Sequence, residues 1–323
     1  MVLNCRISIG PVGFLSIAEV EIESSWRNFT DRAKIKLPRA MSYLDDGRPK
    51  KMTVPIRELI KTGDAVTIEL GYNGSYVSEF TGYISRSPRP SFPYELECED
   101  EMWQLKRERV SISMPRATIR EILEAVAPGY EIDCPDEVYG KISLKDTTPL
   151  KVFDHLRKTA GLYTFFRGSR LVSGLVHSDP KISDTVANYV FGKNIINDRL
   201  QFISGTDIRT IIYATATAPN GVVTRASVGE TGGNVIRRNL QGSYTKKQLE
   251  AQLLREYEQL RTTGGYDGEL ISFGFPYVVH GQTVRIKDDL YEQRDSEHFV
   301  DEVGVTFGPT TGYRRTMRIS SAI

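Results

Sequence analysis

Two stretches of the chain present strand-forming segments in the same order, and this repeat restricts the folds open to the sequence. The first, residues 63–98, alternates apolar and polar residues, turns at Asn73-Gly74 and ends in a further alternating segment. Asn-Gly favours a tight hairpin turn, and a period of two is typical of half-buried strands. The second stretch, residues 281–317, repeats this order with similar spacings between apolar positions. Ile68 and Phe80 are 12 residues apart, and Ile286 and Phe299 are 13 apart. The spacing is 10 residues both from Ile84 to Tyr94 and from Val303 to Tyr313. We therefore predict a duplicated antiparallel β module; the alternative is that any two β-meanders resemble each other at this level.

Residues 1–107 are predicted to form the first domain, an antiparallel β unit. Apolar residues alternate along residues 3–9 and 33–37, and residues 55–61 have the pattern of a short helix with proline at its first turn. Residues 39–53 form a polar insertion that is long for a hairpin loop, and loops of that length are often functional.

Residues 108–185 change in character and predict a small α/β domain with two strand–helix–strand units. Thr118-x-x-Glu121 is a capping box at the start of one amphipathic helix. Thr148-Pro149 begins a second helix, and Gly161 ends it.

Residues 186–323 return to strand patterns and hold one longer helix, residues 245–261. That helix begins with Thr245-x-x-Gln248, a second capping box, and carries an apolar stripe. The chain is thus expected to be mainly β with an α+β insertion.

Composition excludes several classes of protein. The net charge of +1, from 42 basic and 41 acidic residues, argues against a protein that grips nucleic acid through its phosphates, although a lumen that only lets nucleic acid pass needs no basic excess. Three cysteines, Cys5, Cys98 and Cys134, lie too far apart for a zinc ribbon, and the first two occupy apolar strand positions. No signal peptide or membrane span is predicted, so we expect no membrane embedding.

The sequence offers no convincing catalytic, cofactor or metal site. The four histidines, His155, His177, His280 and His298, do not pair at metal-ligand spacing. Carboxylate pairs such as Asp45-Asp46, Asp100-Glu101 and Asp288-Asp289 lie in turns or at helix starts, where they cap backbone donors. Residues 229–234 lack the Gly-Lys-Ser/Thr of a phosphate loop. We predict a protein that is not an enzyme.

The first module resembles the N-terminal domain of phage baseplate hub proteins, including the late control protein D family and the Mu-type tail protein. The resemblance depends on residues 35–39, on 63–74 with the following Phe80-Thr-Gly-Tyr-Ile84, and on the Leu96-to-Arg107 segment that contains Glu-Cys-Glu-Asp. Residues 108–180 are also similar to the small domain of those hubs and to secretin-type N-terminal domains, whereas the last third matches only in layout.

This resemblance implies two tail-tube-like antiparallel β-barrels per chain and a homotrimer on assembly, with six barrels around a channel. It implies a symmetry adaptor that joins the hexameric tail tube to the trimeric spike, with the spike as a separate chain. The implied partners are the tail tube protein, the spike protein, and the tape-measure protein and DNA that pass through the channel. The expected location is the virion baseplate, after synthesis in the bacterial host cytoplasm.

Two polar segments are expected to contact neighbouring molecules, with a mobile surface loop as the alternative for each. Their candidate interface residues are Arg39, Arg48, Lys50 and Lys51 in the first segment, and Gly232, Gly233, Arg237 and Arg238 in the second. Two other functions stay open: the hub of a contractile injection or type VI-like secretion machine, and a tail-associated enzyme that degrades cell wall, which would need a carboxylate pair about 5–10 Å apart in a cleft.

Overall fold

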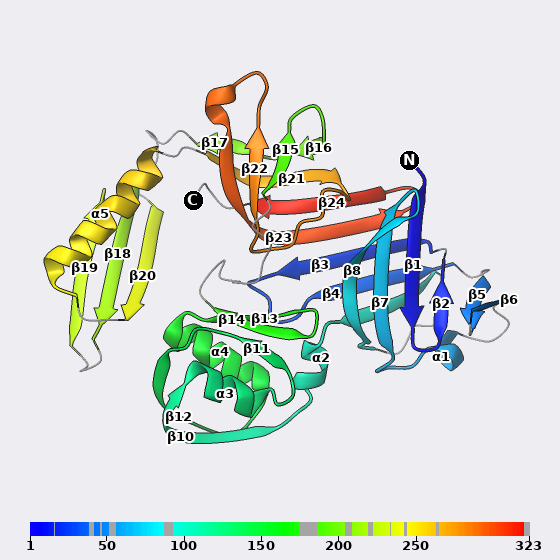
Figure 1. Cartoon of the computed structure of the whole chain (residues 1–323), viewed down its shortest axis with the longest axis horizontal. Helices are drawn as coiled ribbons and strands as arrows, with labels where there is room; N and C mark the ends of the chain where they lie inside the picture. Colours follow the sequence, from blue (N-terminus) through cyan, green and yellow to red (C-terminus); the bar gives the residue numbers. More distant parts are fainter. Residues whose placement is uncertain are drawn as a thin grey trace. The chain divides into compact units, whose positions relative to one another are not determined.

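The structure is a computed structural model that describes residues 1–15, 17–38, 42–45, 47–51, 56–86, 93–174, 186–203, 209–218, 222–232, 234–241, 244–262 and 265–319. The chain is mainly β, as the sequence predicts (Figure 1). No helix within these ranges combines the length and apolar character needed to cross a membrane.

Two compact units make up the chain. Unit 1 comprises Met1–Ser183, Ile271–Gln282 and Asp301–Arg318, and unit 2 comprises Asp184–Leu270, Thr283–Val300 and Ile319–Ile323. Strands β21 (Gly265–Phe273) and β23 (Ser296–Gly308) therefore have residues in both units. The division into domains after residues 107 and 185 stays a prediction.

The N-terminal part of unit 1 is an antiparallel sheet with two short helices. Its elements are β1 (Leu3–Ile9), β2 (Val12–Phe14), β3 (Glu19–Ser25), β4 (Arg32–Leu37), β5 (Ser42–Asp45), β6 (Arg48–Lys51), α1 (Ile56–Leu59), β7 (Ala65–Tyr72), β8 (Ser75–Ile84), β9 (Tyr94–Glu99) and α2 (Met102–Leu105). The predicted hairpin turn is confirmed, because Asn73 and Gly74 join β7 to β8 with φ angles of 52° and 85°. Cys5 and Cys98 are buried in strands as expected, and burial raises the pKa of their thiols to about 11 and about 12.

The order of strand pairing repeats, in agreement with the predicted duplication. The first order is β7–β8–β9–β4, and the second is β22 (Thr283–Lys287), β23, β24 (Gly312–Ile319) and β21. The strands preceding each set differ, since β1 pairs with β7 antiparallel, whereas β15 (Ala187–Val190) pairs with β22 parallel. Among the described residues no strand pairing closes either set into a barrel.

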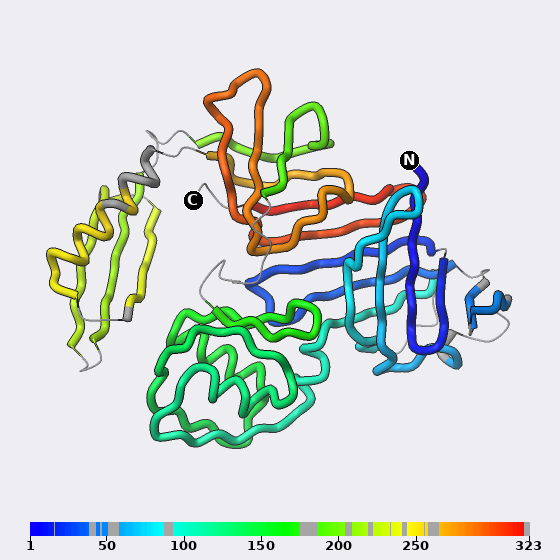
Figure 2. The backbone as a smooth tube through the Cα atoms, viewed as in Figure 1, coloured from blue at the N-terminus to red at the C-terminus, as the bar shows by residue number. Residues whose placement is uncertain are grey.

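Residues 108–174 contain the predicted helices and strands and can be followed from cyan to green in Figure 2. They form β10 (Val110–Thr118), α3 (Ile119–Val126), β11 (Glu131–Asp133), β12 (Val138–Thr147), α4 (Pro149–Ala160), β13 (Tyr163–Arg167) and β14 (Arg170–Gly174). Both sides of the Thr118–Glu121 capping box are present, and Gly161 ends α4 with a φ of 69°. Helix α3 contacts β10 and β11, helix α4 contacts β12 and β13, and their apolar faces share one core.

Unit 2 contains a three-stranded sheet with a helix on one face. The sheet order is β19 (Val223–Gly229), β18 (Thr210–Thr217) and β20 (Asn234–Gln241), and α5 (Lys246–Thr262) packs against it (Figure 1). Thr245 and Gln248 form the predicted capping box at the start of α5. The remaining elements are β16 (Ile195–Asp198), β17 (Gln201–Ile203) and the 3-10 helix η2 (Glu292–Arg294).

Candidate functional site

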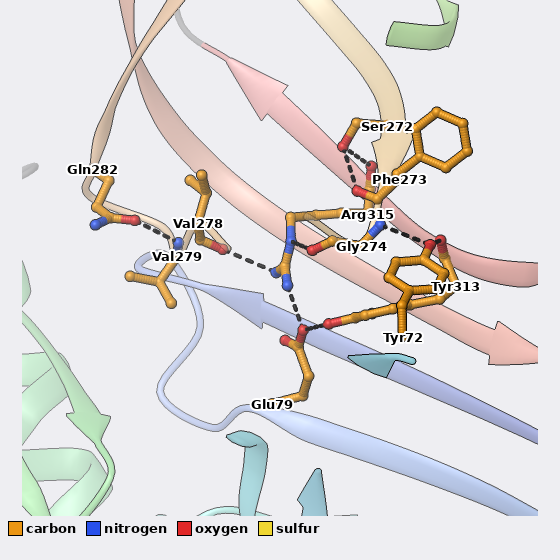
Figure 3. Close-up of polar contacts among 10 residues, drawn as sticks. All are labelled: Tyr72, Glu79, Ser272, Phe273, Gly274, Val278, Val279, Gln282, Tyr313 and Arg315. Carbon is orange, nitrogen blue, oxygen red and sulfur yellow. Dashed lines mark hydrogen bonds and ion pairs between the residues drawn. The ribbon is translucent and has the colours of Figure 1, made fainter. Parts of the chain in front are cut away.

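Glu79 on β8 and Arg315 on β24 form a buried ion pair within unit 1 (Figure 3). Their side chains are 3% and 1% exposed. The hydroxyl of Tyr313 also donates a hydrogen bond to Glu79. Because a buried charge is costly without partners, each member of this network depends on the others.

The guanidinium of Arg315 also holds the segment that follows β21. Its Nη1 donates to the carbonyl oxygen of Val278 at 2.9 Å, and its Nε donates to that of Gly274 at 3.3 Å (Figure 3). The hydroxyl of Tyr72 donates to the carbonyl oxygen of Tyr313 at 2.7 Å. The network thus joins β8, β24 and residues 274–278.

A cavity of about 300 Å³ lies in unit 1 beside this ion pair. Its polar lining includes the side chains of Asp31, Glu79, Asp100, Arg167 and Arg315. Several acidic and basic side chains line this cavity, so its chemistry tests the enzyme hypothesis.

Asp31 and Asp100 meet at one side of this cavity. The backbone N–H of Asp31 donates to Oδ2 of Asp100 at 3.1 Å, and the backbone N–H of Asp100 donates to the carbonyl oxygen of Asp31 at 3.2 Å. Burial raises the pKa of Asp31 to about 6, against the opposing effects of the Ser24 hydroxyl and Arg167. Burial, followed by the charge of Asp31, raises the pKa of Asp100 well above its usual range.

These carboxyl groups are engaged in structural hydrogen bonds. Oδ2 of Asp31 accepts from the Ser24 hydroxyl at 2.5 Å, and Oδ1 of Asp100 accepts from the backbone N–H of Met102 at 3.1 Å, the capping role expected for Asp100. Glycoside hydrolysis needs one carboxyl that protonates the substrate and a second that acts as base or nucleophile. The arrangement instead ties the β3–β4 turn to the start of α2, so it acts as a clamp between loops.

The histidines are separated and occupy different surroundings. His155 lies 3.0 Å from the Tyr139 hydroxyl, His280 is buried against Phe165, and His298 is buried 2.8 Å from the Ser296 hydroxyl. His177 lies outside the described residues. In the part of the chain that the structure describes, no three His, Cys, Asp or Glu side chains gather in a way that could hold a metal ion.

The first predicted interface segment forms a β-hairpin in unit 1. Arg48 and Lys50 lie on β6, which pairs with β5, and both are exposed. Lys50 forms an ion pair with Asp45. Lys51 is the last residue of β6, and Arg39 lies outside the described residues.

The second predicted segment forms a turn and a strand in unit 2. Gly232 occupies the turn with a φ of 92°, and Gly233 lies outside the described residues. Arg237 and Arg238 are adjacent on β20 and therefore point to opposite faces of the sheet. Arg238 binds Glu256 on α5, with its Nε 2.9 Å from Oε1, so only Arg237 lies on the face away from the helix.

The sequence patterns point to no function for Glu79 or Asp31, and Arg315 is one position of an apparent alternating strand. Arg315 stands between Tyr313 and Met317 at positions that the period of two assigns to the core. A cation at such a position requires a buried carboxylate partner, and this signal could have found the network, although not the identity of the partner.

No protein-family model and no curated protein sequence matches the chain. Solved structures do match. The tail protein from Neisseria meningitidis MC58 has a TM-score of 0.62 and 14% identity, over 99% of this chain and 96% of its own. The 43 kDa tail protein of prophage MuSo2 from Shewanella oneidensis has a TM-score of 0.61 and 16% identity, over 98% of both chains. The chain has the fold of phage tail proteins.

A secretion protein shares this fold. The Escherichia coli c3393 protein, a component of the type VI secretion system with structural similarity to the T4 tail proteins gp27 and gp5, has a TM-score of 0.56 at 10% identity. The match covers 98% of this chain and 77% of that protein. The resemblance to phage tail proteins expected from the first module is therefore confirmed at the level of the fold.

Proposed function

We propose that this protein is a structural component of a phage or prophage tail, the baseplate hub that joins a hexameric tail tube to a trimeric spike. The observation that carries the proposal is the match to two tail proteins over almost the whole length of each chain. The repeated strand order supports the adaptor role, because two similar modules in each of three chains offer six similar contacts to a tube.

The assembly that we propose is a homotrimer in the virion baseplate. Each chain contributes two tail-tube-like barrels, residues 1–107 and 186–323, with the α/β domain of residues 108–185 between them. Pairing of strand edges between copies would complete the barrels into a ring and would cover edges that otherwise invite aggregation. The tape-measure protein and DNA pass through the central channel, and the two polar segments that contain Arg48 and Arg237 contact neighbouring molecules.

A hub of a contractile injection or type VI-like secretion machine is the second candidate, favoured by the match to the E. coli secretion component. A wall-degrading enzyme is disfavoured, because hydrogen bonds and ion pairs already engage the carboxyl groups of Asp31, Glu79 and Asp100 in the cavity.

Mass measurement of the full chain, alone and with a phage tail tube protein, tests the hub. We expect a species of three times 36.4 kDa that binds the tube protein at its six-fold end. A chain that stays monomeric with both tube and spike proteins would contradict the hub. Release of cell-wall fragments that is abolished by Asp31→Asn or Asp100→Asn would instead establish the enzyme.

A further inference from the structure

The three-stranded sheet of unit 2 has one covered face and one open face. Helix α5 covers the first face, where its Leu249 and Leu253 join the core with Ile212 of β18. Successive strand residues point to opposite sides. We call the other side the open face, and it contains Tyr213, Val223, Arg225, Ser227, Val235 and Arg237.

The open face combines exposed apolar groups with unneutralised positive charge. Tyr213, Val223 and Val235 are 42%, 48% and 50% exposed. Strands β18, β19 and β20 contain no Asp or Glu. In the described part of the chain neither Arg225 nor Arg237 has a carboxylate partner. Tyrosine and arginine are the residue types that contribute most to protein interfaces, so this surface has the composition of a docking site.

A second exposed feature of unit 2 has the complementary composition. The connection between β22 and β23 contains Asp289, Leu290, Tyr291 and Glu292, which we call the acidic tip. Leu290 is 86% exposed, and Tyr291 is 46% exposed. A carboxylate stands on each side of this apolar pair, and that of Asp289, which is 60% exposed, also forms an ion pair with the exposed Lys193 at 2.8 Å.

Hydrogen bonds within the loop hold the acidic tip in shape. The backbone N–H of Leu290 donates to Oδ1 of Asp288 at 2.9 Å, and the backbone N–H of Asp288 donates to Oδ1 of Asp295 at 3.0 Å. The guanidinium of Arg294 lies 4.3 Å from the centre of the Tyr291 ring. Leu290 is therefore presented outward by a preorganised loop, which lowers the entropic cost of binding through it.

We propose that the acidic tip of one copy binds the open face of the next copy. Asp289 and Glu292 supply two carboxylates for Arg225 and Arg237, and Leu290 covers the exposed apolar side chains between them. Pairs of arginine and carboxylate can form two parallel hydrogen bonds, which fixes the orientation of the contact.

Contact through two different surfaces is head-to-tail, and such contacts close into rings when the rotation permits. The inference rests on the proposed trimer for the number of copies, but the contact itself can be tested separately. Single-stranded nucleic acid is the weaker partner, because proteins that bind it stack bases on several aromatic rings, and the residues named for the open face include one such ring. Pairing of two open faces is disfavoured, because both carry arginines without carboxylates.

Disulfide trapping tests the contact directly in the full chain carrying Cys134→Ser. Equal amounts of a Leu290→Cys chain and a Tyr213→Cys chain are equilibrated in a glutathione redox buffer, and mixed dimers are quantified by mass. The control pairs Tyr213→Cys with Val138→Cys, which is 58% exposed in unit 1. We expect at least about a tenfold excess of the mixed dimer over the control, because the contact raises the effective concentration of the two thiols. Equal yields would overturn the proposal, as would an oligothymidine that binds Arg225 and Arg237 without any excess of the mixed dimer.

Reversal of the charges on the open face and on the acidic tip is the second test of the contact. Arg225→Glu with Arg237→Glu in the Tyr213→Cys chain should remove the excess of mixed dimer, and Asp289→Arg with Glu292→Arg in the Leu290→Cys chain should restore it. Lys246→Glu with Lys247→Glu, on exposed positions of α5, is the matched control and should have no effect. If the trimer forms and survives Arg225→Glu with Arg237→Glu, the contact is wrong and the hub stands. If trapping succeeds but no trimer forms, the contact stands and the hub fails.

Discussion

Replacement of Arg315 by methionine tests the buried network at the centre of unit 1. The substitution keeps the volume of the side chain but removes the cation, so Glu79 would stay at 3% exposure without its ion-pair partner. It also removes the donors to the carbonyl oxygens of Gly274 and Val278. The carboxylate would keep only the Tyr313 hydroxyl as a donor among the contacts shown in Figure 3.

Removal of one partner from a buried ion pair costs about 3–5 kcal/mol, because the other charge is left uncompensated. We expect Arg315→Met to lower the free energy of unfolding of unit 1 by that amount. Replacement of both residues, as Glu79→Leu with Arg315→Met, removes the unpaired charge and should recover about 1–3 kcal/mol of the loss.

Urea denaturation followed by tryptophan fluorescence measures this effect selectively. Both tryptophans, Trp26 and Trp103, lie in unit 1, so the signal reports the unfolding of that unit. The matched control is Arg6→Met, which breaks an ion pair with Glu69 whose side chains are 54% and 30% exposed. Exposed pairs contribute about 0–1 kcal/mol. A loss from Arg315→Met no larger than that of the control would refute the reasoning.

Three further predictions concern other parts of unit 1. Burial raises the carboxyl pKa of Asp31 to about 6 and that of Asp100 well above its usual range, so the folded state favours their protonated forms. The free energy of unfolding, measured by fluorescence, should therefore fall as pH rises from about 4 through 6, and Asp100→Asn should flatten this dependence. Gly82→Ala should cost about 2–4 kcal/mol in urea titrations, because the new Cβ would lie 2.1 Å from the carbonyl oxygen of Glu99. Thr118→Ala should cost about 1 kcal/mol in thermal unfolding followed by circular dichroism, because the helix loses its capping box.

Local structure was largely predictable from the sequence. The capping boxes at Thr118 and Thr245, the glycine after α4 and the Asn73-Gly74 turn depend on residues within a few positions of one another. Their physics is local, so a short window of sequence contains the whole signal. The order of the strand-forming segments followed from short alternating patterns in the same way.

Strand register was not predictable from these spacings. Ile68 faces Phe80 across β7 and β8, and matched spacing would place Ile286 opposite Phe299. In the structure Ile286 faces Ser296, and Phe299 faces Thr283. The longer connection that contains η2 shifts the pairing by three residues, and the length of a connection does not reveal how much of it stays outside the ladder.

Side-chain partners far apart in sequence were also beyond prediction. The Glu79–Arg315 pair depends on tertiary packing, because no local pattern links residues 236 positions apart. By contrast, the different surroundings of Arg237 and Arg238 follow from strand alternation alone, and the two need not have been grouped into one interface.

Because Glu79 and Arg315 lie 236 positions apart in the sequence, their ion pair can form only late in synthesis. A ribosome adding about 5–20 residues per second needs roughly 12–47 s to extend the chain from one residue to the other. Throughout that interval the carboxylate has no guanidinium, and β3 has no β23 to pair with along its free edge. The nascent N-terminal sheet therefore keeps an unpaired strand edge until the last strands are made, and chaperones that cover this edge are expected to raise the yield of folded protein.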